Sequence, residues 1–154
     1  LRFLLMDCPN DENCESFVNE LKAHNVTTVV RVCEATYDKN QFVNNGIEFI
    51  DLPYPDGTVP TNQEIVKFIQ LCQKTFGSIS IPNHIIQDEI ITPIQNPKVI
   101  AVHCMVGLGR APLLVAIALI EAGFAPLDAI EYIRQAKRGA MNPSQLKYLL
   151  DYKK

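Results

Sequence analysis

Cys104 and Arg110 are separated by five residues, and together they can hold and attack a phosphate group. A cysteine thiolate is a strong nucleophile, and a guanidinium presents a planar fork of donors that matches two phosphoryl oxygens. An apolar, strand-like segment precedes Cys104, and an apolar segment of helical character follows Arg110. A loop between a buried strand and a helix N-terminus directs its amide groups toward a bound anion. The pattern therefore predicts an anion-binding loop that carries its own nucleophile.

The residues between the cysteine and the arginine suit such a loop. Gly107 and Gly109 allow the backbone angles that a tight curl requires. We expect the phosphate oxygens to be bound by the backbone N–H groups of Met105, Val106, Gly107, Leu108, Gly109 and Arg110. The same dipoles stabilise a thiolate at Cys104. Attack on phosphorus then gives a cysteinyl-phosphate that water hydrolyses, and neither a metal nor another cofactor is needed, because amides and one guanidinium neutralise the transferred group.

A general acid must protonate the departing alkoxide or phenoxide, which is otherwise a poor leaving group at neutral pH. Asp56 is the candidate, because it lies in a Pro-Asp-Gly loop after the strand expected over Ile47 to Leu52. The carboxyl ends of parallel strands meet at one edge of a sheet, so this loop should lie beside the Cys104 loop. Asp51 is the alternative acid, although its place before the loop favours the binding of backbone donors.

Short apolar strands alternate with amphipathic helices along the chain and would position these residues. Strands are expected at 1–6, 26–33, 47–52 and 99–103, and helices after Asn10 or Asp11 and over about 62–76, 110–122, 127–138 and 143–152. Thr61 to Glu64 has the spacing of a capping box. The alternation predicts an α/β three-layer sandwich, in which helices flank a central, mainly parallel sheet.

The composition fits one globular domain. The chain has 154 residues, of which 47% are hydrophobic and 20% charged, so we expect a single domain over 1–154 with an insertion at about 78–98. A net charge of −3 is too acidic for a general nucleic-acid binder. The five cysteines include no C-x-x-C pair and no segment resembles a signal peptide, which favours a cytoplasmic location. The apolar segment 111–120 predicts a buried core helix.

The run from His103 to Pro112, His-Cys-Met-Val-Gly-Leu-Gly-Arg-Ala-Pro, resembles the active-site loop of the phosphatases of regenerating liver, the type 4A protein tyrosine phosphatases. The likeness extends to Arg2-Phe3-Leu4, Val26 to Cys33, Ala35 to Lys39, Leu119 to Glu121, Ile133 to Gln135 and Arg138 to Ala140. The resemblance implies a protein tyrosine phosphatase of the dual-specificity type. It makes Cys104 the nucleophile, Arg110 the phosphate clamp and Asp56 the general acid.

The resemblance also implies how the enzyme is regulated. Cys33 matches a cysteine that can form a reversible disulfide with the nucleophile and stop the enzyme under oxidation. Ala111 stands where most phosphatases of this kind have a hydroxyl residue, so breakdown of the phosphocysteine should be slow.

His103 should brace the loop, because strand alternation points it away from the anion site. Glu34 follows Cys33, and the sequence leaves two places open for it, the rim of the site and, as the favoured one, a hydrated loop; Cys8 is expected to be an ordinary thiol.

The family acts on phosphoproteins, and the resemblance implies membrane magnesium transporters with CBS-pair domains as partners. The family ends in a polybasic stretch and a prenylated C-a-a-X box. The basic residues after position 133 would then begin a tail that anchors the protein at the cytoplasmic face of a membrane. The acid loop departs from the family pattern, because Trp and paired aspartates are replaced by Leu52-Pro53-Tyr54-Pro55-Asp56-Gly57.

Three other functions stay open at this point. Ala111 favours a low-activity binding module that keeps the phosphatase fold and acts on a membrane transporter. A phosphoinositide substrate is less favoured, because Met105, Val106 and Leu108 supply apolar groups where lysines would help. Sulfurtransferases and arsenate reductases use similar anion loops, but Asp56 upstream of a late cysteine favours the phosphatase.

Overall fold

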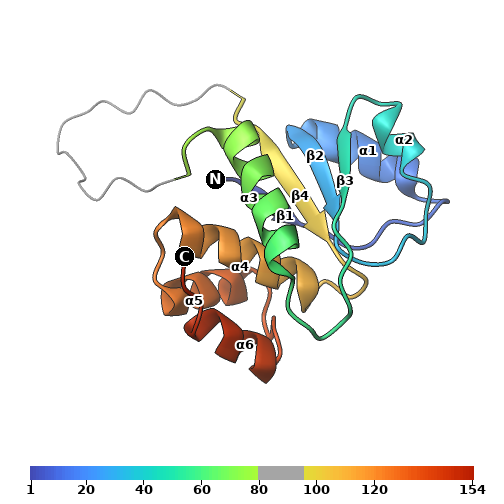
Figure 1. Ribbon diagram of the computed structural model, residues 1–154. Helices are drawn as coiled ribbons and strands as arrows, with labels where there is room; N and C mark the ends of the chain where they lie inside the picture. Colours follow the sequence, from blue (N-terminus) through green and yellow to red (C-terminus); the bar gives the residue numbers. More distant parts are fainter. Residues whose placement is uncertain (80–95) are drawn as a thin grey trace.

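The computed structural model describes residues 1–79 and 96–154 of the chain. Its sheet has the strand order β1-β4-β2-β3, and all neighbouring strands are parallel (Figure 1). The strands are β1 (Phe3–Leu5), β2 (Val26–Arg31), β3 (Glu48–Asp51) and β4 (Val99–His103). The two central strands, β2 and β4, are buried at every residue but one each, as strands covered on both faces are. The parallel sheet predicted from the sequence is therefore confirmed.

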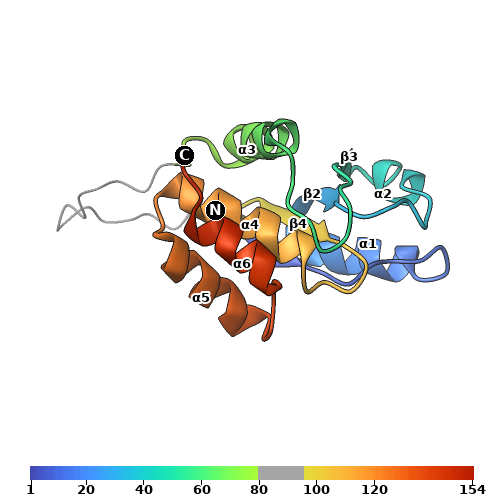
Figure 2. The ribbon, with the colours of Figure 1, turned by 60° about the horizontal axis from the view of Figure 1, so that its bottom comes forward.

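Helices cover both faces of this sheet. They are α1 (Cys14–Ala23), α2 (Asn40–Val43), α3 (Asn62–Phe76), α4 (Arg110–Ala122), α5 (Pro126–Ala136) and α6 (Pro143–Leu150). Val29 and Ala101 pack in the cluster that contains α1 and α2, whereas Val30 and Val102 pack in the cluster that contains α3 to α6. Figure 2 shows α1 and α3 on opposite sides of the strands. The three-layer α/β sandwich is confirmed.

The first helix after the Cys104 loop lies at the centre of its layer. Every residue of α4 except Glu121 is buried, and α3, α5 and α6 all contact this helix. Burial on most sides explains why its sequence is apolar all round. Among the described helices, none is long and apolar enough to cross a membrane.

The helix boundaries differ from the sequence prediction at the start of α1 and at the ends of α5 and α6, of which α6 ends at Leu150, two residues early. Helix α1 begins at Cys14, because the Asn10 side chain caps a separate turn and accepts hydrogen bonds from the Glu12 and Asn13 N–H groups. Helix α5 ends at Ala136, two residues early. The capping box at the start of α3 is present as predicted. The predicted insertion at about 78–98 falls mostly outside the described residues, so the single domain over 1–154 stays a prediction.

Candidate active site

The nucleophile loop, residues 104–109, connects the end of β4 to the start of α4. Cys104 is 3% exposed and Arg110 is 2% exposed, so both residues lie inside the protein. Gly107 has a φ angle of +80°, a left-handed conformation that a side chain would strain. The Leu108 carbonyl accepts a 2.6 Å hydrogen bond from the Met141 N–H group. The nucleophile loop therefore has a tight turn at Gly107, and the hydrogen bond from Met141 holds the loop in place.

Arg110 is anchored by the acid loop, residues 52–61, which follows β3. The Arg110 Nη1 group donates a 3.1 Å hydrogen bond to the Tyr54 carbonyl. The Tyr54 hydroxyl donates a 2.6 Å hydrogen bond to the Arg110 carbonyl. Because Tyr54 holds both the guanidinium and the backbone of the same residue, the donors of Arg110 have a fixed orientation before any substrate binds.

One guanidinium atom of Arg110 has no hydrogen-bond partner among residues 1–79 and 96–154. Its Nε atom is buried and finds no acceptor within the described part of the chain. The Asp56 Oδ1 atom lies 3.6 Å away, which is an ion-pair distance but too long for a hydrogen bond. Leaving a buried donor unpaired costs about 1–3 kcal/mol, and more when the group is charged. An anion beside Nε would supply the missing acceptor, which is what a phosphate clamp requires.

Asp56 lies at the mouth of this arrangement. Its side chain is 78% exposed, and its Oδ1 atom accepts a 2.9 Å hydrogen bond from the Gly57 N–H group. A Cβ atom placed on Gly109 would lie 4.0 Å from the same oxygen, so the carboxylate faces the nucleophile loop. The structure therefore brings Asp56, Gly109 and Arg110 together, as the sequence predicts.

The alternative acid, Asp51, is engaged by side chains. Its Oδ1 atom lies 2.6 Å from Arg31 Nε, its Oδ2 atom accepts from Arg31 Nη2 at 3.1 Å, and Lys39 Nζ lies 3.7 Å from Oδ2. Arg31 and Asp51 are paired in the register of β2 and β3, which explains the two-pronged contact. The expectation that Asp51 binds backbone donors is wrong, because the buried guanidinium of Arg31 requires an anionic partner.

Glu34 contacts the site, which is the less favoured of the two places that the sequence leaves open for it. Its carboxylate oxygens lie 3.3 and 3.4 Å from Arg110 Nη1, although the side chain is 68% exposed. Its own backbone N–H and the Arg110 guanidinium lower the pKa of Glu34. Glu34 is therefore an ionised neighbour of the phosphate clamp. Its position one residue after Cys33, at the carboxyl end of β2, is the only signal in the sequence that points to this edge of the sheet.

Two side chains at the start of α6 hold the acid loop, and neither was predicted to contact the site. Asn142 Nδ2 donates to the Gly57 carbonyl at 3.1 Å, and Gln145 Nε2 donates to the Thr58 carbonyl at 3.1 Å. The same two residues form the capping box of α6. Gln145 is 1% exposed, and its amide also borders Gly109. The cap of α6 therefore connects the acid loop to the nucleophile loop.

His103 braces the nucleophile loop, as predicted. The ring is fully buried, its Nδ1 atom lies 3.1 Å from the Cys104 carbonyl, and its Nε2 atom lies 2.5 Å from the Tyr37 hydroxyl. Burial lowers the pKa of His103 to about 4, so the ring is neutral at pH 7. A carbonyl can only accept, so Nδ1 donates to Cys104 and Nε2 accepts from Tyr37. Both ring nitrogens are thus used in hydrogen bonds. The bond from Nδ1 holds the backbone of Cys104, and the bond from Tyr37 fixes the ring.

The neutral state of His103 makes stability depend on pH. The folded-state pKa of about 4 lies below the value of about 6.5 for an unfolded histidine, so the unfolded chain binds a proton first as the pH falls. The free energy of unfolding should drop by about 3 kcal/mol from this ring between about pH 6.5 and pH 4. Urea unfolding at several pH values measures the loss. A His103→Gln variant should lose less over the same window, and equal losses would contradict the assignment.

Cys33 lies directly after β2 and is buried beside His103. Its Sγ atom is 3.9 Å from His103 Nδ1, and burial raises the pKa of its thiol to about 12. Cys33 and Cys104 are both free thiols. Ala111 is buried in the first turn of α4 and offers no hydroxyl to the nucleophile. The rim of the nucleophile loop consists of exposed apolar side chains, namely Met105, Val106 and Leu108.

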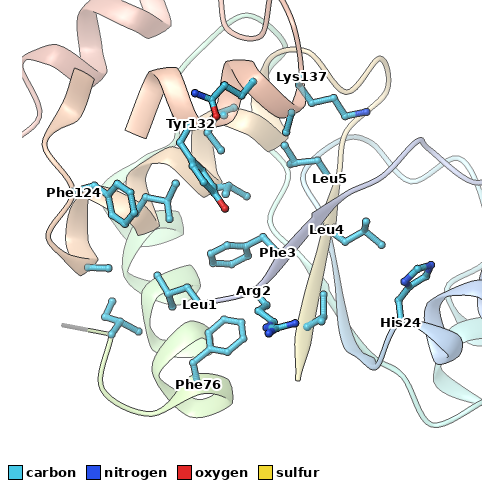
Figure 3. Close-up of a pocket in the computed structure, with 18 of the residues that line it drawn as sticks. Leu1, Arg2, Phe3, Leu4, Leu5, His24, Phe76, Phe124, Tyr132 and Lys137 are labelled. Atoms are coloured by element: carbon cyan, nitrogen blue, oxygen red, sulfur yellow. The ribbon is translucent and has the colours of Figure 1, made fainter. Parts of the chain in front are cut away.

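A groove of about 1200 Å³ runs along β1, away from these residues (Figure 3). Its walls are largely apolar and include Phe3, Phe76 and Tyr132. Among the described residues that line it, none is a cysteine, an aspartate or a glutamate, and none belongs to the nucleophile loop or the acid loop. Size alone would favour this groove as a site, but the chemistry lies at the carboxyl edge of the sheet.

A nucleophile loop between a parallel strand and a buried helix, on a three-layer sandwich, is the arrangement of the protein tyrosine phosphatases of the dual-specificity type. A family model described as "Swiss Army Knife protein, DSP-PTPase phosphatase domain" matches residues 1–149. The solved structure of a protein tyrosine phosphatase from Leishmania major superposes with a TM-score of 0.78 and is 34% identical, covering 99% of this chain and 88% of that chain. The predicted enzyme class is confirmed.

Two relatives identify the family within that class. The protein tyrosine phosphatase type IVA 2 of Mus musculus is 41% identical, over 99% of this chain and 82% of its own length. The PRL-1 phosphatase of Drosophila melanogaster is 40% identical, over 99% of this chain and 78% of its own length. The chain belongs to the type IVA protein tyrosine phosphatases. The family resemblance drawn from the sequence is confirmed.

Proposed function

We propose that Cys104 attacks the phosphorus of a phosphoprotein monoester, in line with the leaving oxygen. The Sγ–P bond forms as the P–O bond breaks, and Asp56 gives its proton to the departing oxygen. Arg110 and the amides of the nucleophile loop hold the remaining phosphoryl oxygens. The observation that carries the proposal is the buried Arg110 Nε atom, which lacks an acceptor and lies 3.6 Å from the Asp56 carboxylate.

In the second half of the reaction, a water molecule attacks the phosphocysteine. Asp56 takes a proton from this water, and Cys104 leaves as a thiolate. Ala111 has no hydroxyl that would stabilise the thiolate, so breakdown of the intermediate should limit turnover. The guanidinium of Arg110 and the N-terminus of α4 remain as the stabilising groups.

Phosphotyrosine is the favoured substrate group, and phosphoserine and phosphothreonine belong to the same proposal. The support comes from the names of the relatives, which are protein tyrosine phosphatases, and from the rim of the site. Val106 is 75% exposed, and Met105 and Leu108 are each 44% exposed. Apolar groups at the rim suit an aromatic side chain in a peptide better than a highly charged inositol headgroup.

The role of Asp56 is tested by its asparagine variant. Asp56→Asn should lower kcat/KM roughly a hundredfold or more for phosphate esters with poor leaving groups, because an amide cannot donate the required proton. The same variant should have a small effect on p-nitrophenyl phosphate, whose leaving group needs little protonation. Steady-state rates on a series of aryl phosphates, plotted against the pKa of the phenol, measure the difference.

Asp51→Asn is the matched control for this experiment. It removes a carboxylate at the end of β3, just before the acid loop, whose Oδ1 atom lies 2.6 Å from Arg31 Nε. It should lower stability, because the buried Arg31 loses its partner. It should leave the dependence on the leaving group unchanged. A steeper dependence in Asp51→Asn than in Asp56→Asn would assign the acid to Asp51.

Regulation, partner and location extend the proposal on the basis of family membership. Cys33 would form a reversible disulfide with Cys104 under oxidation. A membrane magnesium transporter with CBS-pair domains would be the partner, and a basic, prenylated tail would hold the protein at the cytoplasmic face of a membrane. Pro55 replaces an acidic residue of the family's acid loop, so contacts made there with the partner would change. Calorimetric titration of the protein with a CBS-pair domain tests this part.

Ala111 also supports a second candidate function, a low-activity binding module. Slow breakdown of the phosphocysteine would leave the protein occupied and able to act chiefly by holding a partner. Rapid-quench kinetics separate the two functions. A phenol burst favours the enzyme, whereas retained partner binding without any burst favours the module.

A further inference from the structure

Three neighbouring parallel strands are each followed by a cysteine at the same edge of the sheet. Cys8 follows β1, Cys33 follows β2 and Cys104 follows β4. The Sγ atoms of Cys8 and Cys33 lie within 4.8 Å of one another. Cys33 and Cys104 follow the adjacent strands β2 and β4, whose last residues, Arg31 and His103, are paired in register. Cys33 therefore has the Cys8 sulfur close to it and Cys104 on the neighbouring strand end, and Cys8 has no part in the reaction described above.

The surroundings of Cys8 connect it to the active site and to solvent. Its Sγ atom lies 3.7 Å from Thr36 Oγ1 and 4.0 Å from Met105 Sδ, at the rim of the nucleophile loop. Of the five cysteines, Cys8 is the one that is partly exposed, whereas the other four are buried. A thiol reductant in solution can therefore reach Cys8 more readily than Cys33.

Cys8, Cys33 and His103 also form a group whose ligand atoms are close enough for a metal ion. The hydrogen bonds of the imidazole oppose that interpretation. Nδ1 donates its proton to the Cys104 carbonyl, and Nε2 accepts from the Tyr37 hydroxyl, so neither nitrogen offers a free lone pair. Metal binding would have to break the brace of the nucleophile loop. The two sulfur atoms are therefore better interpreted as a thiol pair.

We propose that Cys8 is a second redox thiol, which exchanges with a Cys33–Cys104 disulfide to form a Cys8–Cys33 disulfide and release Cys104. A hydroperoxide first oxidises the Cys104 thiolate to a sulfenic acid, and the peroxide O–O bond breaks to give an alcohol or water. The Cys33 thiol attacks that sulfur, a disulfide forms and water leaves. The Cys8 thiolate then attacks the Cys33 sulfur, the Cys33–Cys104 bond breaks, and Cys104 departs as a thiolate. The exchange step neither oxidises nor reduces the protein as a whole, because one disulfide replaces another.

The direction of the exchange follows from the surroundings of the two leaving sulfurs. Cys104 as a thiolate is stabilised by the N-terminus of α4 and by Arg110. Burial raises the pKa of the Cys33 thiol to about 12, which makes Cys33 the poorer leaving group. An S–S bond is about 2.05 Å long, so side-chain rotation must close the remaining gap between Cys8 and Cys33. The result would move the disulfide from the buried nucleophile to a partly exposed residue, where thiols can reduce it.

The proposal rests on the proposed function in making Cys104 the reactive thiol and Cys33 its disulfide partner, and disulfide mapping tests it without an activity assay. The reduced full chain receives one equivalent of hydrogen peroxide, is trapped with N-ethylmaleimide at successive times and is digested without reductant. Mass spectrometry should find a Cys33–Cys104 peptide pair that is replaced by a Cys8–Cys33 pair, while Cys104 becomes alkylated. Phenol burst amplitude should return without added reductant.

Variants separate the steps. In Cys8→Ser and Cys8→Ala, the Cys33–Cys104 pair should persist, and the burst should return roughly tenfold more slowly or not at all. Cys14→Ser, which alters a buried cysteine on α1, should follow the wild-type course. Cys104→Ser treated with glutathione disulfide should still form the Cys8–Cys33 pair, which tests that pair independently of the nucleophile. Full alkylation of Cys8 at every time, or the same final disulfide with and without Cys8, would overturn the proposal.

Discussion

Replacing Cys104 by serine is expected to abolish the burst of phenol released from an aryl phosphate and to lower turnover roughly a thousandfold or more. A serine hydroxyl is not ionised at neutral pH and needs a base to become a nucleophile. The adjacent histidine cannot serve, because both nitrogens of His103 are used by the Cys104 carbonyl and the Tyr37 hydroxyl. Rapid-quench measurements under reductant, with enzyme at a concentration comparable to substrate, give the burst amplitude directly.

Cys72→Ala is the matched control, because it also removes a fully buried thiol but lies within α3. It should keep the full burst while losing some stability through the small cavity it leaves. Thermal melts of both variants exclude unfolding as the cause of lost activity. A burst that survives in Cys104→Ser would remove the nucleophile assignment, and with it the proposed mechanism.

Arg110→Lys should lower kcat/KM by about 10²–10³, which corresponds to about 2.7–4 kcal/mol of lost transition-state stabilisation. Lysine keeps the charge but presents a single point donor instead of a planar fork. The present guanidinium is fixed by the Tyr54 carbonyl at 3.1 Å from Nη1 and keeps its buried Nε atom unpaired. A lysine ammonium cannot bind the Tyr54 carbonyl and also take the place of the Nε donor to phosphate. Initial rates, together with the inhibition constant of inorganic phosphate, measure the loss in turnover and in ground-state binding.

Glu34→Gln is the companion variant for this prediction, because it changes the other partner of Nη1 without removing a donor from the clamp. The Glu34 carboxylate lies 3.3 Å from that atom and repels an incoming dianion. We therefore expect KM to stay the same or to fall, with kcat largely preserved. Wild-type affinity for phosphate in Arg110→Lys, or a loss in Glu34→Gln as large as that in Arg110→Lys, would contradict the assigned clamp.

The elements whose sequence patterns are strongest agree with the structure to the residue. Helix α3 occupies Asn62–Phe76 behind its capping box, β4 occupies Val99–His103, and α4 occupies Arg110–Ala122. Each has a local cause that the sequence displays, namely a reciprocal cap, a short run of apolar residues, or a glycine at the helix end. The proximity of Asp56 to Arg110 could also be predicted, because parallel strands bring their following loops to one edge.

The contacts that no local sequence pattern shows are made by residues far apart in the chain. Gln145 reaches the Thr58 carbonyl across 87 positions, and Glu34 reaches Arg110 across 76. No periodicity or spacing records such a pair, since it arises from how two loops meet after the sheet has formed. The contact of Asp51 with Arg31 is likewise absent from any local pattern, because the two residues become neighbours only through the register of β2 and β3.

The cap of α6 determines how much of the chain must be synthesised before the proton donor is held in place. The amides that hold the acid loop, from Asn142 and Gln145, belong to the last helix of the described chain. A ribosome-bound chain that has exposed residues up to 140 already contains the nucleophile and its clamp but lacks the groups that fix its proton donor. Full activity therefore requires that Gln145 has been synthesised and that α6 has packed against the acid loop.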